Sequence, residues 1–417
     1  MIFKEITREM YEVFQKDHVY RNYLNTVEAH DLKAMSGWRI VYVGVFKADI
    51  LMGATVLSFL PIMKCYQYAS AQRGFLIDYR NQEVFVFFIK ELKTYLKKAR
   101  VLYLHVDPYV LYQERDIHGE VVKDGFSNKD ILDALKQQGF KHLGFRIGIS
   151  DIYRERWMFT LSLENKSEEE VLQNMHQQAK RSIHKTLRDH VLVREMKLEE
   201  LDLFVDIMKH TSERRAFIDR GKTYYENFFK AYKDKATLLL ASINIEEYLQ
   251  RLYQAQQQEQ ASLQSIEQKI LEDSESKKLL KKKRVCEENL RIYQRKIEEA
   301  CILQKKYGVC IPLAAAIFMK AENELTYLFS GAYDDCKKFG GPYALQWEMI
   351  RYAIKHQYKR YNFYGISGDF RKDAKDYGVY EFKKGFDGCV EELIGDCILP
   401  IRKFVFAFYR KLKKNRF

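Results

Sequence analysis

The residues of this sequence best suited to binding a ligand are Arg and Lys residues interleaved with aromatic residues. One such cluster, at 214–225, contains Arg220 and, four residues later, Tyr224. Arginine binds pairs of oxygen atoms bidentately, and aromatic rings can cover bases or sugars. The cluster therefore favours recognition of a phosphate or a nucleotide, and a structural ion pair with Asp219 is the alternative.

A second basic cluster consists of Lys180, Arg181 and Lys185. Residues 167–170 (Ser-Glu-Glu-Glu) are typical of a capping box, so we expect one helix that begins near Ser167 and carries these cations on one face. Such a face can follow the phosphates of a nucleic acid. A solvated basic face without a ligand is the alternative.

Two basic segments near the C-terminus place cations beside apolar side chains. The segment 382–386 (Phe-Lys-Lys-Gly-Phe) follows a stretch that we expect to be extended, and the tail 402–417 contains seven Lys or Arg and no acidic residue. A basic amphipathic helix of the latter kind can lie on an anionic membrane. Packing of its aromatic residues on the protein core is the alternative.

Two glycine segments could bring backbone N–H groups to a ligand. Gly340-Gly341-Pro342 opens an expected helix, and a helix N-terminus can bind an anion. The alternative is a simple helix start with Pro at the first helical position. The segment 365–368 (Gly-Ile-Ser-Gly) follows an expected strand and would let the backbone approach a ligand closely.

The motifs of several enzyme classes are absent from the sequence. There is no P-loop, no dinucleotide fingerprint after a strand, no HExxH and no GxSxG. The 10 His residues do not cluster, and the 7 Cys residues form neither a CxxC pair nor a metal-ligand spacing. We therefore predict no metal site, and reduced cytoplasmic thiols rather than a disulfide framework.

Charge and length narrow the choice of partner and location. The 417 residues include 70 Lys plus Arg and 57 Asp plus Glu, and the resulting net charge of +13 indicates an anionic partner. Two or three domains are expected from the length. The charged N-terminus (Lys4, Glu5, Arg8) is not a signal peptide, and no apolar run approaches ~18 residues. A cytosolic location with contact at a membrane surface is expected.

The segment 245–306 differs from the rest of the chain because it has no Pro and no Gly. Its core positions alternate in steps of four and three on both sides of a polar tip at 273–276, which places Leu263 opposite Cys286. This pattern predicts an antiparallel helical hairpin with arms roughly 40 Å long. Three polar residues occupy core positions, so we expect weak packing of the outer part: Gln256, Glu259 and Lys283.

The rest of the chain repeats one α/β plan. In the first copy we expect strands at 40–46 and 52–60, a helix at 84–98 and a strand at 101–106. In the second copy the corresponding elements are strands at 237–244, 310–319 and 325–330, a helix at 343–356 and a strand at 360–365. Strands flank the helical hairpin on both sides, so it is predicted to be an insertion within the second copy.

The sequence as a whole resembles the Fem aminoacyltransferases, which build peptidoglycan interpeptide bridges. The FemA/FemB-like branch is the most similar, and FemX and MurM/MurN are related. The most specific segments are 73–78, 102–109, 343–350, 361–368 and 382–386. The resemblance implies an α/β (α+β) fold of two GNAT-like units, the first at 1–150 and the second at 151–244 with 307–417. Residues 245–306 form the coiled-coil arm, and we allow for the extreme C-terminus returning to the first unit.

The resemblance also implies a reaction, namely transfer of Gly, Ala or Ser from aminoacyl-tRNA to an amine of lipid II or bridge-extended lipid II. The amine attacks the tRNA ester, a tetrahedral oxyanion forms and the tRNA hydroxyl leaves. The protein must orient the reactants and stabilise charge, which requires no nucleophilic side chain, metal or cofactor. Association with a second copy or another Fem-type enzyme, and a place at the inner face of the membrane, are further expectations.

Several residues take roles from the resemblance. Lys33 matches the lysine that holds the phosphates of the precursor, and Arg220 and Tyr224 match residues that share this task. Lys383, beside the substrate-binding Phe382, matches the lysine that stabilises the tRNA end or the developing oxyanion.

Asp107 occupies the place of a candidate general base, with a buried structural carboxylate as the alternative. From charge alone, the cations expected to face the tRNA acceptor stem are Lys180, Arg181 and Lys185.

Two other functions remain open from the sequence. An acyl-CoA-dependent GNAT-type N-acyltransferase would bind CoA, but it leaves the helical hairpin unexplained. A non-catalytic tRNA-binding protein would show salt-sensitive tRNA binding and no acyl transfer.

Overall fold

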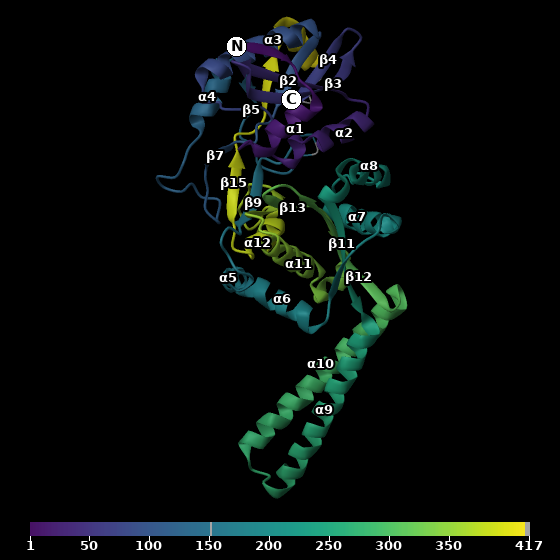
Figure 1. Cartoon of the computed structure of the whole chain (residues 1–417). Coiled ribbons are helices and arrows are strands. Elements are labelled where there is room, and N and C mark those ends of the chain that lie inside the picture. Colours follow the sequence, from purple (N-terminus) through teal and green to yellow (C-terminus); the bar gives the residue numbers. More distant parts are fainter. Residues whose placement is uncertain (151, 413–417) are drawn as a thin grey trace.

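The computed structural model describes residues 1–150 and 152–412, which form two mixed β-sheets, their covering helices and a projecting helical hairpin (Figure 1). Sheet A has the strand order β1-β2-β3-β4-β6-β16-β8, with β5 paired to β3. Its strands are β1 (Ile2–Glu5), β2 (Arg39–Lys47), β3 (Ile50–Met63), β4 (Tyr66–Ala71), β5 (Leu76–Ile77), β6 (Val101–Val106), β8 (Lys141–His142) and β16 (Cys397–Pro400).

Sheet B has the order β10-β11-β12-β13-β14-β9-β15-β7. Its strands are β7 (Leu111–Glu114), β9 (Trp157–Ser162), β10 (Leu192–Glu195), β11 (Ala236–Asn244), β12 (Cys310–Lys320), β13 (Glu324–Ala332), β14 (Arg360–Ile366) and β15 (Cys389–Leu393). Thus β7, early in the chain, belongs to sheet B, and β16, late in the chain, belongs to sheet A.

The first unit follows the predicted order of elements. Strands β2, β3 and β4 are antiparallel, α3 (Gln82–Lys98) crosses over, and β6 returns parallel to β4. Asn81 caps α3 by accepting a hydrogen bond from the N–H of Val84, and the helix buries an apolar face on the sheet. The helices α1 (Arg8–Asp17), α2 (Val27–Met35) and α4 (Lys129–Gln137) complete this unit.

The second unit repeats this order. Strands β11, β12 and β13 are antiparallel, α11 (Gly341–Lys355) crosses over, and β14 is parallel to β13. A Cβ on Gly341 would lie 2.7 Å from Cβ of Leu313, so glycine lets α11 start directly against β12. This contact favours the helix-start interpretation of Gly340-Gly341-Pro342. The predicted fold of two GNAT-like α/β units is confirmed, while the boundary near residue 150 stays a prediction.

A two-stranded ribbon joins the two sheets. Strand β6 of sheet A continues into β7 of sheet B, and β15 of sheet B continues into β16 of sheet A. The pairs run antiparallel on both sides, with Cys397 opposite Val106 in sheet A and Leu393 opposite Leu111 in sheet B. Between them the N–H of Ile394 donates to the carbonyl of Val110 at 2.9 Å. The ribbon is therefore paired as far as Ile394 and Val110 from the side of sheet B, and again from Cys397 and Val106 in sheet A.

Buried ion pairs line this ribbon. Glu392 on β15 accepts hydrogen bonds from Arg156 and, at 2.7 Å, from Nε of Arg115. Asp396, just before β16, accepts from Nε2 of His105 at 2.8 Å and from Arg146. Removing one partner of such a pair would leave an uncompensated buried charge, so these contacts hold the crossing in one arrangement.

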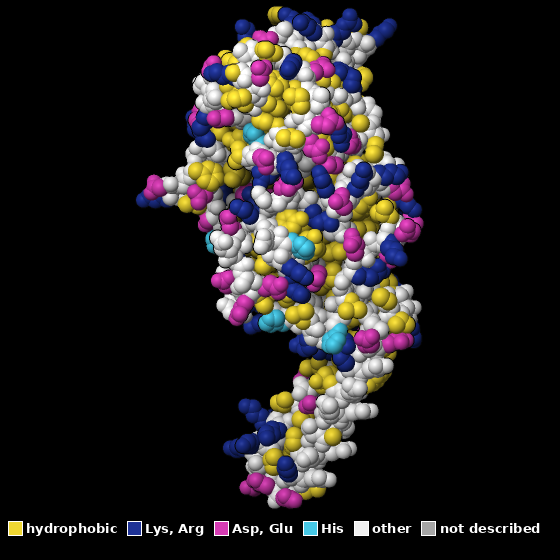
Figure 2. Space-filling view, in the orientation of Figure 1, with side chains coloured by type: hydrophobic (Ala, Val, Ile, Leu, Met, Phe, Trp, Pro, Cys, Tyr) yellow, Lys and Arg dark blue, Asp and Glu magenta, His cyan; other side chains and the backbone are white. Residues whose placement is uncertain are grey.

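The helical hairpin consists of α9 (Ile245–Glu272) and α10 (Lys277–Tyr307), and its predicted register is confirmed. Leu263 and Cys286 are both buried, and polar pairs occupy some of the other layers, such as Gln256 Nε2 with Gln294 Oε1 at 3.2 Å. Lys283 in the core is paired with Glu267 at 2.8 Å. Figure 2 shows Lys and Arg side chains gathered along one edge of the hairpin near its far end.

The hairpin replaces a tight turn. In the first unit β2 and β3 are joined by Ala48 and Asp49, both with positive φ (48° and 64°). In the second unit the equivalent strands, β11 and β12, keep their pairing up to Asn244 opposite Cys310, where the hairpin begins and ends. The insertion therefore leaves the two strands paired to their ends, with one register shift between Ala241 and Ser242.

Two expectations about helices are wrong. The segment expected as one helix from Ser167 is two helices, α5 (Glu168–Asn174) and α6 (Gln177–Arg188), because Met175 and His176 adopt extended ψ values of 152° and 149°. The predicted capping box of Ser167 is present. The stretch before 382–386 is not extended, since it belongs to α12 (Tyr377–Lys384), whose last turn includes Phe382 to Lys384.

The C-terminal tail forms a helix on the first unit. α13 (Lys403–Leu412) buries Phe406 and Tyr409 against sheet A, so core packing accounts for part of the aromatic pattern. Residues 413–417 of the predicted basic tail lie outside the described part. No helix in the described part is long and apolar enough to span a membrane.

Candidate substrate and transfer site

Lys33 lies where the two units meet. It is on α2, which packs against α8 (Lys222–Tyr232) of the second unit. Its Nζ is 3.5 Å from Oγ of Ser58 and 5.2 Å from the ring centroid of Trp38. Burial lowers the pKa of Lys33 to about 7, the charge of Arg154 lowers it further and Asp107 opposes this. A bound anion would restore the ammonium form, as expected of a phosphate ligand.

Arg220 and Tyr224 lie together at the start of α8. The guanidinium of Arg220 is 5.7 Å from the ring centroid of Tyr224 and is exposed. The alternative of an ion pair with Asp219 is wrong, since Asp219 instead accepts hydrogen bonds from the N–H of Gly221 at 2.9 Å and from Tyr225 at 2.6 Å. Burial raises the pKa of Tyr224, and the charges of Arg154 and Arg220 oppose that rise.

Arg154, which belongs to none of the sequence motifs, connects these groups. Its charge acts on both Lys33 and Tyr224. Burial disfavours the guanidinium charge, but Tyr364, Tyr23 and neighbouring Glu155 outweigh burial and raise the pKa of Arg154. Arg154 therefore stays charged at the junction of the two units.

Lys383 lies on the second unit beside the same segment. It is buried, and its Nζ donates to the carbonyl of Gly365 at 2.6 Å. Burial lowers the pKa of Lys383 to about 7, while Glu155 opposes the shift. A Cβ on Gly365 would lie 2.4 Å from Cγ of Glu155, so this glycine lets the end of β14 approach Glu155. The interpretation of 365–368 as a site of close backbone approach agrees with this contact.

Phe382 holds the last turn of α12 in place. Its ring packs edge-on against Tyr343 of α11 at 4.9 Å and against Phe386 at 5.4 Å. Lys383 is therefore fixed at the end of a short helix by the apolar residues around it, and Phe382 itself is half-buried.

Asp107 is already engaged within the protein. Its Oδ1 accepts from the backbone N–H of Arg73 at 2.9 Å, and Oδ2 lies 3.6 Å from the guanidinium of the same residue. Arg73 also donates to the carbonyl of Glu155 at 2.9 Å. Asp107 directly follows β6, where the ribbon leaves sheet A. These contacts favour a structural carboxylate over a free general base.

We call the group formed by Lys33, Arg154, Glu155, Tyr224 and Lys383 the central cluster. It unites residues from α2, α8, α12 and the segment before β9. The charge of Glu155 acts on Arg154 and on Lys383, and the charge of Arg154 acts in turn on Lys33, so the cluster links two amines with lowered pKa values through one guanidinium and one carboxylate. This arrangement can bind anionic groups at the junction and, at Lys383, stabilise a negatively charged oxygen.

The three cations of α6 lie outside the central cluster. Lys180 Nζ donates to the carbonyl of Gln173 at 2.6 Å, and the half-buried Lys185 donates to the carbonyl of Lys338, so both have structural partners. Arg181 is exposed. The helix starts next to the Lys383 turn, because the N–H of His176 donates to the carbonyl of Gly385 at 2.9 Å.

Arg154 and Glu155 were missed because they precede β9 in an irregular segment without periodicity. The available signal was local composition: the run Tyr153-Arg154-Glu155-Arg156 combines an aromatic ring with both charges before a buried strand. Among the described residues, no group of three or more His, Cys, Asp or Glu is arranged to hold a metal ion.

Two units on one plan, joined by a ribbon and sharing a basic cluster, define a tandem GNAT-like protein. A model of the FemAB family matches residues 6–414, and the chain belongs to this family, as the sequence resemblance predicted. Aminoacyltransferase FemA of Staphylococcus epidermidis (strain ATCC 12228 / FDA PCI 1200) is 39% identical over an alignment of 420 residues, which covers 99% of each chain. Aminoacyltransferase FemA of Staphylococcus aureus (strain N315) is 37% identical over 415 residues, again 99% of each. The crystal structure of FemX has the same fold, with a TM-score of 0.75 at 24% identity and coverage of 98% of this chain and 99% of that chain.

Proposed function

We propose that this protein is an aminoacyltransferase that moves an amino acid from aminoacyl-tRNA to an amine of a lipid-linked peptidoglycan precursor. Family membership and relatives named aminoacyltransferase FemA, matched over 99% of their length, support the class of reaction. The observation that carries the finer proposal is the central cluster, in which cations run from Lys33 on the first unit to Lys383 on the second.

The precursor end of the cluster is assigned to Lys33, Arg154 and Tyr224, together with Arg220, which lies beside Tyr224. A lipid-linked precursor carries a pyrophosphate, and each charge-assisted hydrogen bond to such a group contributes about 1.5–3 kcal/mol. Neither Lys33 nor Arg154 has a carboxylate within ion-pair distance in the described part of the chain. The positive charge of each side chain is therefore available to phosphate oxygens.

The transfer end is assigned to Lys383. The nitrogen of the acceptor amine attacks the ester carbonyl carbon, a C–N bond forms, and the C–O bond to the tRNA hydroxyl breaks. The proton lost by the amine finally resides on the leaving oxygen. As an ammonium, Lys383 donates to the oxygen that becomes negative in the tetrahedral intermediate, a contribution of typically ~3–4 kcal/mol for such a donor.

The tRNA is proposed to approach along α6. Of the three cations expected to face the acceptor stem, Arg181 is the exposed one, and the helix starts beside the turn that holds Lys383. Lys180 and Lys185 are assigned a supporting role because each already donates to a backbone carbonyl. A place at the inner face of the membrane and association with another Fem-type chain complete the proposal.

The test is transfer of a radiolabelled amino acid from Gly-, Ala- and Ser-tRNA to lipid II and to bridge-extended lipid II. Label should appear in the lipid fraction with at least one pair of donor and acceptor. No transfer with any pair, together with CoA binding by calorimetry, would replace the proposal by an acyl-CoA-dependent N-acyltransferase. Salt-sensitive tRNA binding without transfer would instead leave a tRNA-binding protein.

A further inference from the structure

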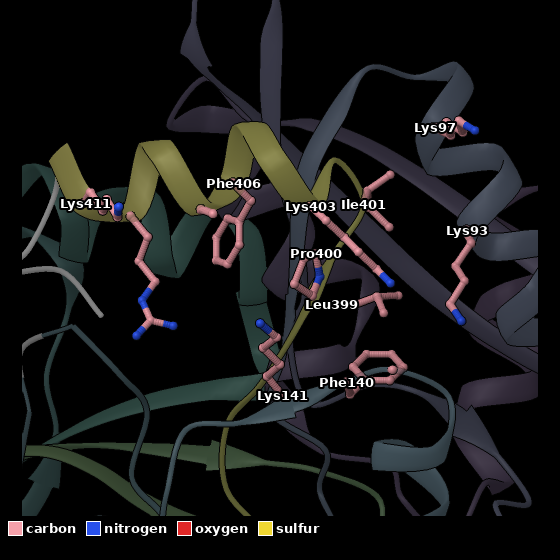
Figure 3. Close-up of a pocket in the computed structure, with 13 residues that line it drawn as sticks. Lys93, Lys97, Phe140, Lys141, Leu399, Pro400, Ile401, Lys403, Phe406 and Lys411 are labelled. Atoms are coloured by element: carbon pink, nitrogen blue, oxygen red, sulfur yellow. The ribbon is translucent and has the colours of Figure 1, made fainter.

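A cavity of about 990 Å³ opens on the first unit between α3, β8, β16 and α13 (Figure 3). Its apolar lining comes from Phe140, Leu399 and Phe406, among others. None of its lining residues belongs to the central cluster. Six of them are cationic and none is acidic: Lys93, Lys97, Lys141, Lys403, Arg410 and Lys411.

The positive charge in this cavity is not balanced by the protein. None of the six cations is within 4.0 Å of a carboxylate in the described part of the chain. Figure 3 shows Lys93 and Lys403 extending toward the same space from α3 and α13. Burial lowers the pKa of Lys93, and the charge of Lys403 lowers it further. Like charges held together in this way are stabilised by an anion.

The helix α13 adds an apolar surface next to these cations. Its inner face packs on sheet A, where the ring of Phe406 is 5.0 Å from that of Tyr103. Three other side chains, at steps of four, form an outward stripe: Phe404 is 93%, Phe408 61% and Leu412 65% exposed. Among the described residues Phe404 is the most exposed large apolar side chain. The stripe borders the basic face that carries Lys403 and Lys411.

We propose that this cavity binds the phosphate headgroup of an anionic phospholipid while α13 lies on the bilayer surface with Phe404, Phe408 and Leu412 in the interfacial layer. Cations at headgroup depth beside apolar rings on one helix are the combination that interfacial binding requires. A nucleic acid would neutralise the cations but leave the outward stripe in water. The proposal rests on the proposed membrane contact and is independent of the transfer reaction.

Sedimentation of the full chain with vesicles tests the cavity. Vesicles of phosphatidylglycerol and phosphatidylcholine in equal parts are compared with vesicles of phosphatidylcholine alone. The variant Lys93→Glu/Lys141→Glu/Lys403→Glu should lose affinity for the anionic vesicles by at least about tenfold, since each basic residue near the surface contributes to binding.

The matched control reverses three exposed lysines of the hairpin, Lys277, Lys278 and Lys281, and changes net charge equally. This control should bind anionic vesicles within about twofold of the unchanged chain. An equal loss of vesicle affinity in the cavity variant and the hairpin control would show that only net charge matters, and would overturn the proposal. If the cavity variant lost tRNA binding but still bound vesicles, the cavity would be a nucleic-acid site and the lipid proposal would be wrong.

The variant Phe404→Ser/Phe408→Ser keeps every charge. It tests membrane binding by α13 even if the charge-reversal variant does not fold. It should also bind anionic vesicles at least about tenfold more weakly, because the apolar anchors are lost. Unchanged vesicle binding would contradict the proposed orientation of α13. Both variants should transfer an amino acid normally to a water-soluble acceptor peptide, which separates this proposal from that of the transfer reaction.

Discussion

Lys33 and Lys383 show how burial sets the chemistry of single residues here. Both amines have a pKa lowered to about 7, and burial is the main cause in each. Neither has a carboxylate within ion-pair distance in the described part of the chain; Lys383 donates to a backbone carbonyl instead. The charge of each amine is thus available to an anionic group of a substrate.

Replacing Lys383 by Met is expected to lower kcat by about 10²–10³ while the fold is retained, because a donor to the developing oxyanion is lost. The protonation state of Lys383 determines the direction of the pH dependence. The amine is protonated below its pKa of about 7 in the free enzyme, so kcat/KM of the unchanged enzyme should fall as the pH rises through that value. Steady-state kinetics between about pH 6 and about pH 9 should show this decline, and the Met variant should lack it. A normal rate in the variant would remove Lys383 from the site.

The variant Arg154→Gln tests the precursor end of the central cluster. Loss of one charge-assisted contact, ~1.5–3 kcal/mol, should weaken precursor binding by about tenfold to a hundredfold. Calorimetry with lipid II in detergent measures this. The matched control is Arg80→Gln, whose exposed guanidinium pairs with Asp130 away from the cluster, and it should bind normally. Equal affinity of the two variants would exclude Arg154 from the phosphate site.

Asp107→Asn distinguishes a structural carboxylate from a general base. Both Asp107 and Arg73 are buried, so neutralising the carboxylate leaves Arg73 without its counter-charge. The free energy of unfolding should drop by about 3–5 kcal/mol in urea titrations. The folded fraction should still turn over with an unshifted pH profile. Unchanged stability with abolished turnover would point to proton transfer instead.

At the scale of elements, periodic segments were predictable and irregular ones were not. The strands, α3, α11 and the register of the hairpin follow from repeated apolar spacing, which Leu263 opposite Cys286 illustrates. The break at Met175 and His176 was missed because the helical pattern continues on both sides of it. Lys33 came from family resemblance alone, and Arg220, Tyr224 and Lys383 lie in basic segments that composition also selected. Arg154 and Glu155 depend on tertiary packing that spacing does not encode.

The distal half of the hairpin is expected to be dispensable for folding. Its buried residues in that half are Leu263 and Cys286, while the base packs into the core through residues such as Leu252 and Ala300. Replacing residues 257–293 by a short Gly-rich loop should change Tm by only a few degrees in thermal scans. A large drop would mean that the far end supports the core. The same variant, assayed for tRNA binding, shows whether the basic edge near the tip contacts nucleic acid.

At the scale of the whole molecule, the paired ribbon makes the folding of each unit depend on the other. Strand β16 lies between β6 and β8 within sheet A, so the first unit lacks an internal strand when the C-terminal part of the chain is absent. A fragment of residues 1–150 should therefore be unfolded or aggregated by circular dichroism and gel filtration. Co-expression with residues 152–417 should restore a soluble complex. A stable, cooperatively folding fragment would contradict this prediction and favour two independent domains.

The ribbon also determines how substrates reach the central cluster. A hinge between two domains needs a single flexible connection, or several that bend at one point. Here two antiparallel strands cross together, hydrogen-bonded at Ile394 and Val110 and flanked by the buried ion pairs of Glu392 and Asp396. A rotation of one unit away from the other would break that pairing. We therefore expect the two units to keep one relative arrangement during turnover, with access governed by side chains and short loops rather than by closure of domains.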